Sequence, residues 1–252
     1  MFRHLPSAAL LVVLLLGSLP ALAGSGSGSV RVEPSEVQIG VCYSGQRLSV
    51  RATTPSPRKI VMRLTSADEP LTLKKKGKKY GLIWRNMGDV HFTAVPTVYL
   101  LRSSCPLEQI AAPETLERMK LGYDGVRRQC LRGSDDAPPE LFAELVKLKQ
   151  KDHLFDWQAG GIQIQPADAG RQEAVGEFLL PAKAPVGDYT VDVFAFQGGK
   201  GELIGTANVR LRRGAAVSAI TDLAANHGLL YGCLAVAVAV LAGLSTGLVF
   251  GR

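Results

Sequence analysis

Apolar and polar residues alternate with a period of two along four stretches in the middle of the chain. These stretches are residues 47–52, 60–64, 189–195 and 207–212. Such alternation is typical of β-strands with one buried face, and clusters of Gly, Pro and Asp separate them as turns. Several short strands at this spacing predict a mainly β fold, an immunoglobulin-like antiparallel β-sandwich over residues 30–213.

A helical periodicity interrupts the strands. The sequence predicts a short helix over 113–121, ended by Gly122, and a clearer one over 138–152. In the second, Pro139 opens the helix, and Leu141, Leu145 and Leu148 form one apolar stripe. We interpret residues 106–158 as a helical insertion that packs over a sheet edge.

The first residues have the three-part pattern of a secretory signal peptide. Arg3 and His4 precede an apolar run from Ala8 to Leu16, and Ala21-Leu22-Ala23 provides small residues for cleavage. Residues 1–23 are therefore expected to be a signal peptide, with an uncleaved anchor as the alternative. Residues 24–29, GSGSGS, form a flexible spacer.

The other end of the chain predicts one transmembrane helix. Residues 229–250 contain no charge, and 22 helical residues span about 33 Å, the thickness of a hydrocarbon core. Residues 214–228 are a juxtamembrane connector, and residues 251–252 a cytoplasmic end carrying Arg252. The expected location is the bacterial inner membrane, crossed once, with the domain in the periplasm.

Small residues recur every four positions along this predicted span. They are Ala235, Ala239, Gly243, Gly247 and Gly251. This spacing favours close packing against another transmembrane helix, from a partner protein or a second copy of the chain. Ordinary use of Gly and Ala in membrane helices is the alternative interpretation.

Charge becomes informative once the two ends are set aside. The whole chain has a mean hydropathy of +0.12 and a net charge of +7. Residues 24–228 hold all 22 acidic residues and an ordinary share of charged residues for a folded domain. Residues 51–85 carry ten basic and two acidic residues, so the positive charge is one local patch.

The core of that patch is a lysine run with Gly77 expected at a hairpin tip. It comprises Lys74, Lys75, Lys76, Lys78 and Lys79. Candidate partners are lipid head groups, an acidic protein or a small anion. A solvated hairpin that protects a sheet edge is the alternative, and an exported domain makes nucleic acid an unexpected partner.

Cysteine and histidine give little support for catalysis. Of three exported cysteines, Cys105 and Cys130 are the favoured disulfide, which would leave Cys42 over. The sequence has no HExxH, P-loop or dinucleotide fingerprint, and no CxxC pair. We expect no enzyme, metal or cofactor.

Four blocks in order resemble an alphaproteobacterial-type family of transmembrane proteins without established activity. The blocks are Tyr43 to Leu48, GLIWRNMGDVHFTAVPTVYLLRSSCPL at 81–107, LPAKAPVGDYTVDVFAF at 180–196 and LLYGCLAVAVAVLAGLSTGLVFGR at 229–252. The resemblance implies a signal peptide, a periplasmic β-domain and one C-terminal membrane helix. It also implies occurrence beside permeases of the sulfite exporter type, while no catalytic residues carry over.

These observations favour a non-enzymatic accessory protein in the periplasm that partners a membrane transporter, with an anion exporter as the candidate. One alternative is a periplasmic module that binds or senses a small anion or lipid. A further alternative is an envelope enzyme using Cys42 or His91, which nothing in the sequence requires.

Overall fold

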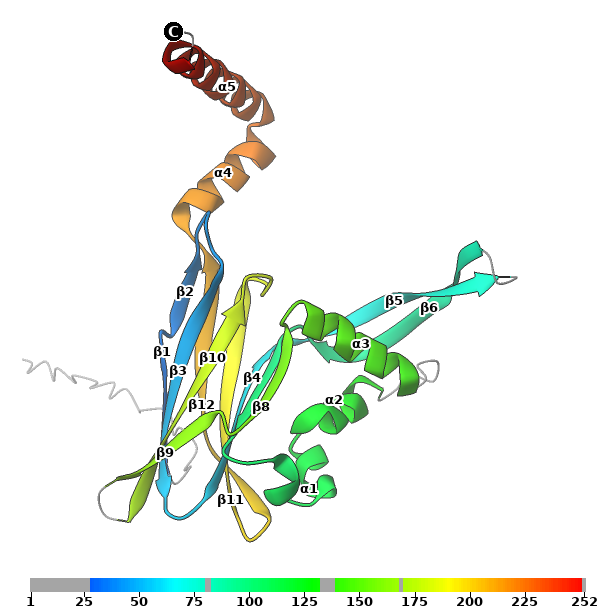
Figure 1. The fold of residues 1–252 in the computed structure, drawn as a ribbon, viewed down its shortest axis with the longest axis vertical. Coiled ribbons are helices and arrows are strands. Elements are labelled where there is room, and N and C mark those ends of the chain that lie inside the picture. The colour runs from blue at the N-terminus through cyan, green and yellow to red at the C-terminus, as the bar shows by residue number, and fades with distance from the viewer. Residues whose placement is uncertain (1–27, 80–82, 132–138, 168–169, 251–252) are drawn as a thin grey trace, which may run out of the picture.

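The structure is a computed structural model and describes residues 28–79, 83–131, 139–167 and 170–250. Two sheets form a β-sandwich, from which a helical tail and a long hairpin project (Figure 1). The expected signal peptide and most of the spacer lie outside the described residues. The mainly β fold class is confirmed.

The first sheet contains four strands in the order β1-β3-β10-β9. Their bounds are β1 Ser29–Glu33, β3 Gly45–Pro55, β9 Ile162–Ala167 and β10 Arg171–Pro181. All three pairings are antiparallel. Along β3, buried Leu48, Val50 and Ala52 alternate with more exposed residues, as the period-two pattern predicted.

The second sheet contains six strands in the order β2-β12-β11-β4-β7-β8. Their bounds are β2 Glu36–Ile39, β4 Lys59–Ser66, β7 Tyr99–Ser103, β8 Phe155–Ala159, β11 Gly187–Gln197 and β12 Lys200–Arg213. The outer strands β2 and β8 pair parallel with β12 and β7, and the other pairings are antiparallel.

This strand order is that of an immunoglobulin domain. The first sheet matches strands A, B, E and D, and β12-β11-β4-β7 matches G, F, C and C′. Tyr189, near the start of β11, donates a hydrogen bond of 2.5 Å from its hydroxyl to the Pro185 carbonyl. That contact is the tyrosine corner of such domains. It lies in one of the four stretches, residues 189–195, whose alternation predicted a strand.

The core lies between the two sheets. Phe178 and Leu180 from the first sheet, and Met62, Leu64 and Val193 from the second, are essentially inaccessible to solvent. Arg102 of β7 crosses between the sheets, donating from Nε to the Glu177 carbonyl at 3.1 Å. Burial of this apolar area is the main force that holds the sandwich together.

The helical insertion lies beside β8 and differs from its predicted bounds. It contains η1 Leu107–Gln109, α1 Pro113–Arg118, α2 Gly122–Cys130 and α3 Pro139–Lys151. Gly122 begins α2 and does not end the first helix as expected. The helices end at Lys151, because Phe155 to Ala159 form hydrogen bonds with β7 as a strand.

Two helices follow the end of β12. They are α4, Ala215–Asn226, and α5, Gly228–Phe250. The Gly214 amide donates to the Ile39 carbonyl at 2.9 Å, which fixes the start of α4 beside the end of β2. The tail therefore leaves from one defined end of the sandwich, here called the tail end (Figure 1).

Candidate functional site at the base of the hairpin

A long two-stranded hairpin is the most prominent projection of the domain. It is formed by β5, Asp68–Lys79, and β6, Ile83–Pro96, which pair only with each other among the described strands. Twelve residues at about 3.4 Å each give a length of about 40 Å. Its outer half stands clear of the sandwich (Figure 1), so we call the whole hairpin the arm.

The lysine run lies along one strand of the arm. Lys74 faces Asp89, Lys76 faces Asn86 and Lys78 faces Trp84 in the backbone register. Gly77 pairs with Arg85 inside the arm, so the prediction that it forms the tip is wrong. Both strands continue their pairing through the lysine run, as far as Lys79 opposite Ile83. Lys74 and Arg85 are exposed.

The base of the arm is fixed by α2. Gln129 donates from Nε2 to the Ala94 carbonyl at 3.1 Å, and the Cys130 thiol lies 3.4 Å from the same oxygen. Phe92 and Val95 of β6 are buried at this junction. The arm is thus part of the folded domain at its base.

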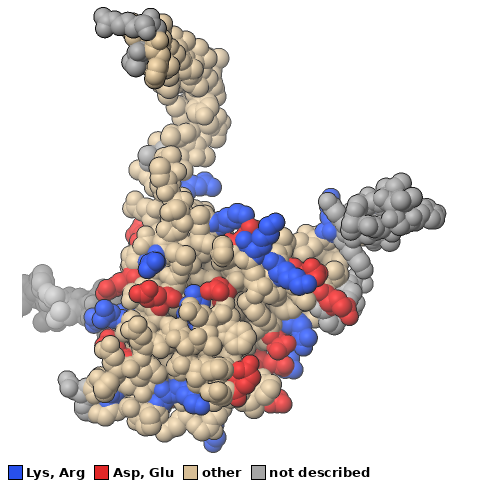
Figure 2. Space-filling view, viewed as in Figure 1, with Lys and Arg blue, Asp and Glu red and all other residues tan. Residues whose placement is uncertain are grey.

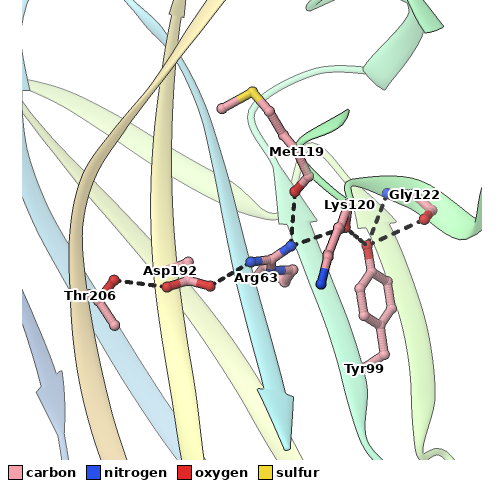
Figure 3. Close-up of polar contacts among 7 residues, drawn as sticks. All are labelled: Arg63, Tyr99, Met119, Lys120, Gly122, Asp192 and Thr206. Atoms are coloured by element: carbon pink, nitrogen blue, oxygen red, sulfur yellow. Dashed lines mark hydrogen bonds and ion pairs between the residues drawn. The ribbon is translucent and has the colours of Figure 1, made fainter. Parts of the chain in front are cut away.

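A polar network connects the sheet to the loop between α1 and α2 (Figure 3). Arg63 of β4 forms a 2.6 Å ion pair with Asp192 of β11, and both side chains are largely buried. The guanidinium also donates to the carbonyls of Met119 and Lys120, at 2.9 and 3.2 Å. These bonds hold the two residues that follow α1 against the sheet.

Tyr99 extends the same network from β7 (Figure 3). Its hydroxyl accepts a hydrogen bond of 2.9 Å from the Gly122 amide and donates to the Lys120 carbonyl at 3.2 Å. Lys120 and Gly122 have φ angles of 56° and 77°, so the loop is sharply turned. Burial raises the pKa of Tyr99 well above its ordinary value. The hydroxyl therefore stays protonated and serves a structural role.

Two cavities adjoin the arm. The first, of about 610 Å³, lies between the base of the arm and helices α1 and α2. Its charged lining residues are Asp68, Glu114, Glu117, Arg118, Lys120 and Arg128. Arg128 and Glu117 form an ion pair with each other at 2.5 Å. The three acidic and three basic lining residues balance, so the lining of this cavity has no net charge.

The second cavity, of about 540 Å³, is a groove between the arm and α3. It is lined by Leu73, Lys74, Val90, Phe92, Leu141, Glu144, Leu145, Lys147, Leu148 and Lys151. The predicted leucine stripe of α3 divides here: Leu145 is fully buried, whereas Leu148 is 51% exposed. Sequence reasoning identified the stripe and the lysines but not the groove, which requires the arm to lie beside α3.

The predicted packing residues of the membrane helix lie along α5. Ala235, Ala239, Gly243 and Gly247 are exposed, and Gly251 lies outside the described residues. A side chain added at Gly243 or Gly247 would meet no atom within 4 Å. The helix contains one segment, Gly228–Leu248, that is long and apolar enough to cross a membrane. Figure 2 shows no Lys, Arg, Asp or Glu side chain on its visible face.

The favoured disulfide is absent from the structure, where all four cysteines are free. Cys130 packs against β6 near the start of β7, whereas Cys105 follows the far end of β7. The two cysteines thus lie at opposite ends of a five-residue strand. Such a strand is longer than about 7 Å, the largest separation of Cα atoms that a disulfide tolerates. Burial, with a smaller contribution from Asp68, raises the pKa of the Cys130 thiol to about 12.

The remaining candidate chemical groups are dispersed. Cys42 is exposed in the loop after β2, while the His91 Nδ1 lies 2.9 Å from the Thr72 hydroxyl within the arm. Within the described ranges, no group of three or more His, Cys, Asp or Glu side chains is placed to hold a metal ion.

Comparison with known proteins found no match among curated proteins and none among solved structures. One family model, described as "Putative transmembrane protein (Alph_Pro_TM)", matches residues 29–252. The match spans the sandwich, the arm, the helical insertion and α5. The resemblance noted from four sequence blocks is thereby confirmed, and the chain belongs to this transmembrane protein family.

Proposed function

We propose that the protein is a non-enzymatic accessory protein of the bacterial inner membrane, with its domain in the periplasm. In this proposal the arm contacts an integral membrane partner of transporter type. A sulfite or anion exporter is the candidate that the family resemblance implies. A single transmembrane helix has no room for a conduction pathway of its own, so any transport belongs to the partner.

The observation that carries the proposal is a long basic arm on a domain tied to one membrane helix. The two strands of the arm pair only with each other among the described strands, and the five residues of β5 after Lys74 add about 17 Å of length. A two-stranded hairpin alone is marginally stable in water. A partner surface that packs against it explains both its length and its charge.

The tail supports contact within the membrane. A short helix, α4, separates the sandwich from α5 and contributes about 18 Å, so the domain stays near the membrane surface. The small-residue positions of α5 offer a close-packing face to a partner helix. Neither α4 nor the small-residue positions of α5 imply an enzyme. Cys42 and His91, the residues of the enzyme alternative, belong to separate parts of the domain.

Photocrosslinking from the arm tests this proposal. A photoreactive amino acid at Arg85 is expected to form an adduct with another integral membrane protein in native membranes. The matched control places the same residue at Lys200, the exposed first residue of β12. Adducts of equal yield from both positions, or none from Arg85, would contradict the proposed role of the arm.

A further inference from the structure

The groove between the arm and α3 has an apolar floor that no described residue covers. Phe92 and Leu145 form buried parts of it, and Leu73 and Leu141 are half-buried beside them. Leu148 completes the wall with half of its surface exposed. A volume of about 540 Å³ lies within the range of small-molecule sites.

The rim of the groove is positively charged. Lys74 comes from the arm, and Lys147 and Lys151 come from the last turns of α3. Glu144 is the one acidic lining residue, and it is paired with Lys147 at 2.8 Å. Lys74 and Lys151 therefore give the rim a net positive charge, in contrast to the balanced cavity beside α1.

The groove lies toward the tail end of the sandwich. Lys149, in the last turn of α3, donates to the Thr97 carbonyl at 3.4 Å, and the Thr97 amide donates to Ser66 at 2.7 Å. Ser66 ends β4 and pairs with Tyr189, whose partner in β12 is Val209. Since β12 runs on into α4, Thr97 and the last turn of α3 that contacts it lie at the tail end of the sandwich.

From these three observations we infer that the groove binds an acyl chain of an anionic lipid drawn from the membrane that α5 spans. The leucine and phenylalanine side chains cover the hydrocarbon chain, while Lys74 and Lys151 contact the anionic head group. Lysines near an anionic lipid surface each contribute favourably, and buried hydrocarbon contributes in proportion to its area. This inference goes beyond contact with a partner protein and does not depend on it.

Photolabelling with a lipid probe tests this site. The full-length protein is reconstituted alone into phosphatidylcholine vesicles that contain phosphatidylglycerol carrying a diazirine in its acyl chain. Labelled peptides are identified by mass spectrometry. The inference predicts label on peptides of α3 and of the arm, together with label on α5. The α5 label serves as the internal standard, because that helix contacts lipid in every variant.

Two matched pairs of variants separate the groove from the rest of the surface. Leu148→Glu places a charge in the wall and is expected to lower the label on α3, relative to α5, about tenfold. Leu203→Glu changes a leucine of similar exposure, 47%, on β12, and should leave that ratio unchanged. Lys151→Gln should lower labelling by phosphatidylglycerol about fivefold, while Lys200→Gln should not.

Several outcomes would overturn the inference. One is label on α5 alone in the wild type. Another is an equal loss in Leu148→Glu and Leu203→Glu, or crosslinks from the groove to a second copy of the chain in place of lipid. Equal labelling by a phosphatidylcholine probe, insensitive to Lys151→Gln, would remove the role of the lysines. Because no partner protein is present, these outcomes are independent of crosslinking from Arg85.

Discussion

Arg63 is a residue of β4 that organises a segment 56 residues further along the chain. Its guanidinium joins Asp192 in the sheet to the carbonyls of the two residues after α1, and it lies 5.2 Å from the centre of the Phe194 ring. Because both charges of the ion pair are largely buried, removing one leaves the other without compensation. The position of α1 and α2, and hence of the arm, depends on this residue.

Replacement of Asp192 measures this dependence. Asp192→Ala is expected to lower the free energy of unfolding by about 2–4 kcal/mol, because Arg63 then stays buried without its counter-ion. Asp188→Ala is the matched control, since Asp188 pairs with Arg210 on the surface, and it should cost under about 1 kcal/mol. Denaturant unfolding followed by circular dichroism makes the comparison. Equal losses would show that the buried pair has no special role.

Cys130 gives a prediction about alkaline pH. Its thiol pKa is raised from 9.0 in the unfolded chain to about 12 in the folded one. Above pH 9 the unfolded state loses this proton while the folded state keeps it, so stability falls as pH rises toward 12. Cys130→Ala should show a shallower fall over this range. A slope identical to that of the wild type would contradict the assignment.

Maleimide at neutral pH should modify Cys42 and spare Cys130 in the folded protein.

At the scale of elements, α3 has two distinct apolar sides. Leu145 is inaccessible and belongs to the core, whereas Leu148, three residues later, lies on the wall of the groove. The two leucines have the same side chain on the same helix, so the difference in burial is their main distinction. The helix both completes the core and forms a surface.

Truncation of each leucine tests this division. Leu145→Ala should destabilise the domain by about 2–5 kcal/mol through a lost contact and a cavity. Leu148→Ala should change stability by no more than about 0.5 kcal/mol, as for other surface substitutions. Thermal unfolding of the two variants provides the measurement. Comparable losses at both positions would mean that the arm packs onto α3 and that the groove is closed.

The sequence predicted elements whose pattern follows from burial on one face. The four alternating stretches became β3, β4, β11 and β12 because each has one face toward the core. Helix α2 was missed because its residues, GYDGVRRQC, are mostly polar and begin with glycine. The turn of the arm was misplaced since the lysine run carries no alternation. Strand order, the pairing of Arg63 with Asp192 and the groove arise from contacts between distant segments, which local patterns do not encode.

At the scale of the whole molecule, the protein is a sandwich with a membrane tail and a basic arm. The net charge of the full chain, +7, reflects mainly the arm and adjoining strands. In the space-filling view, Lys and Arg side chains gather between the base of α4 and the side where the arm emerges (Figure 2). Positive charge on this side suits a domain that works close to an anionic membrane.

The proposed orientation predicts which side of the membrane reaches Cys42. A membrane-impermeant maleimide should label it in cells whose outer membrane alone is permeabilised, because Cys42 is exposed on the domain. The Cys42→Ser variant, which removes the exposed thiol of the domain, is the control and should lose the signal. Label that appears only after the inner membrane is lysed would place the domain in the cytoplasm.

Purification from native membranes in mild detergent tests the central claim most directly. The comparison uses the wild type, the control variant Lys200→Gln, and a variant whose arm is shortened by an Asn-Gly turn joining Lys74 to Asp89. These two residues already face each other, so the base of the arm should stay folded. We predict that a second integral membrane protein co-purifies with the wild type and with Lys200→Gln but not with the shortened arm. Purification of the wild type without any such protein, or retention of the partner by the shortened variant, would contradict the account.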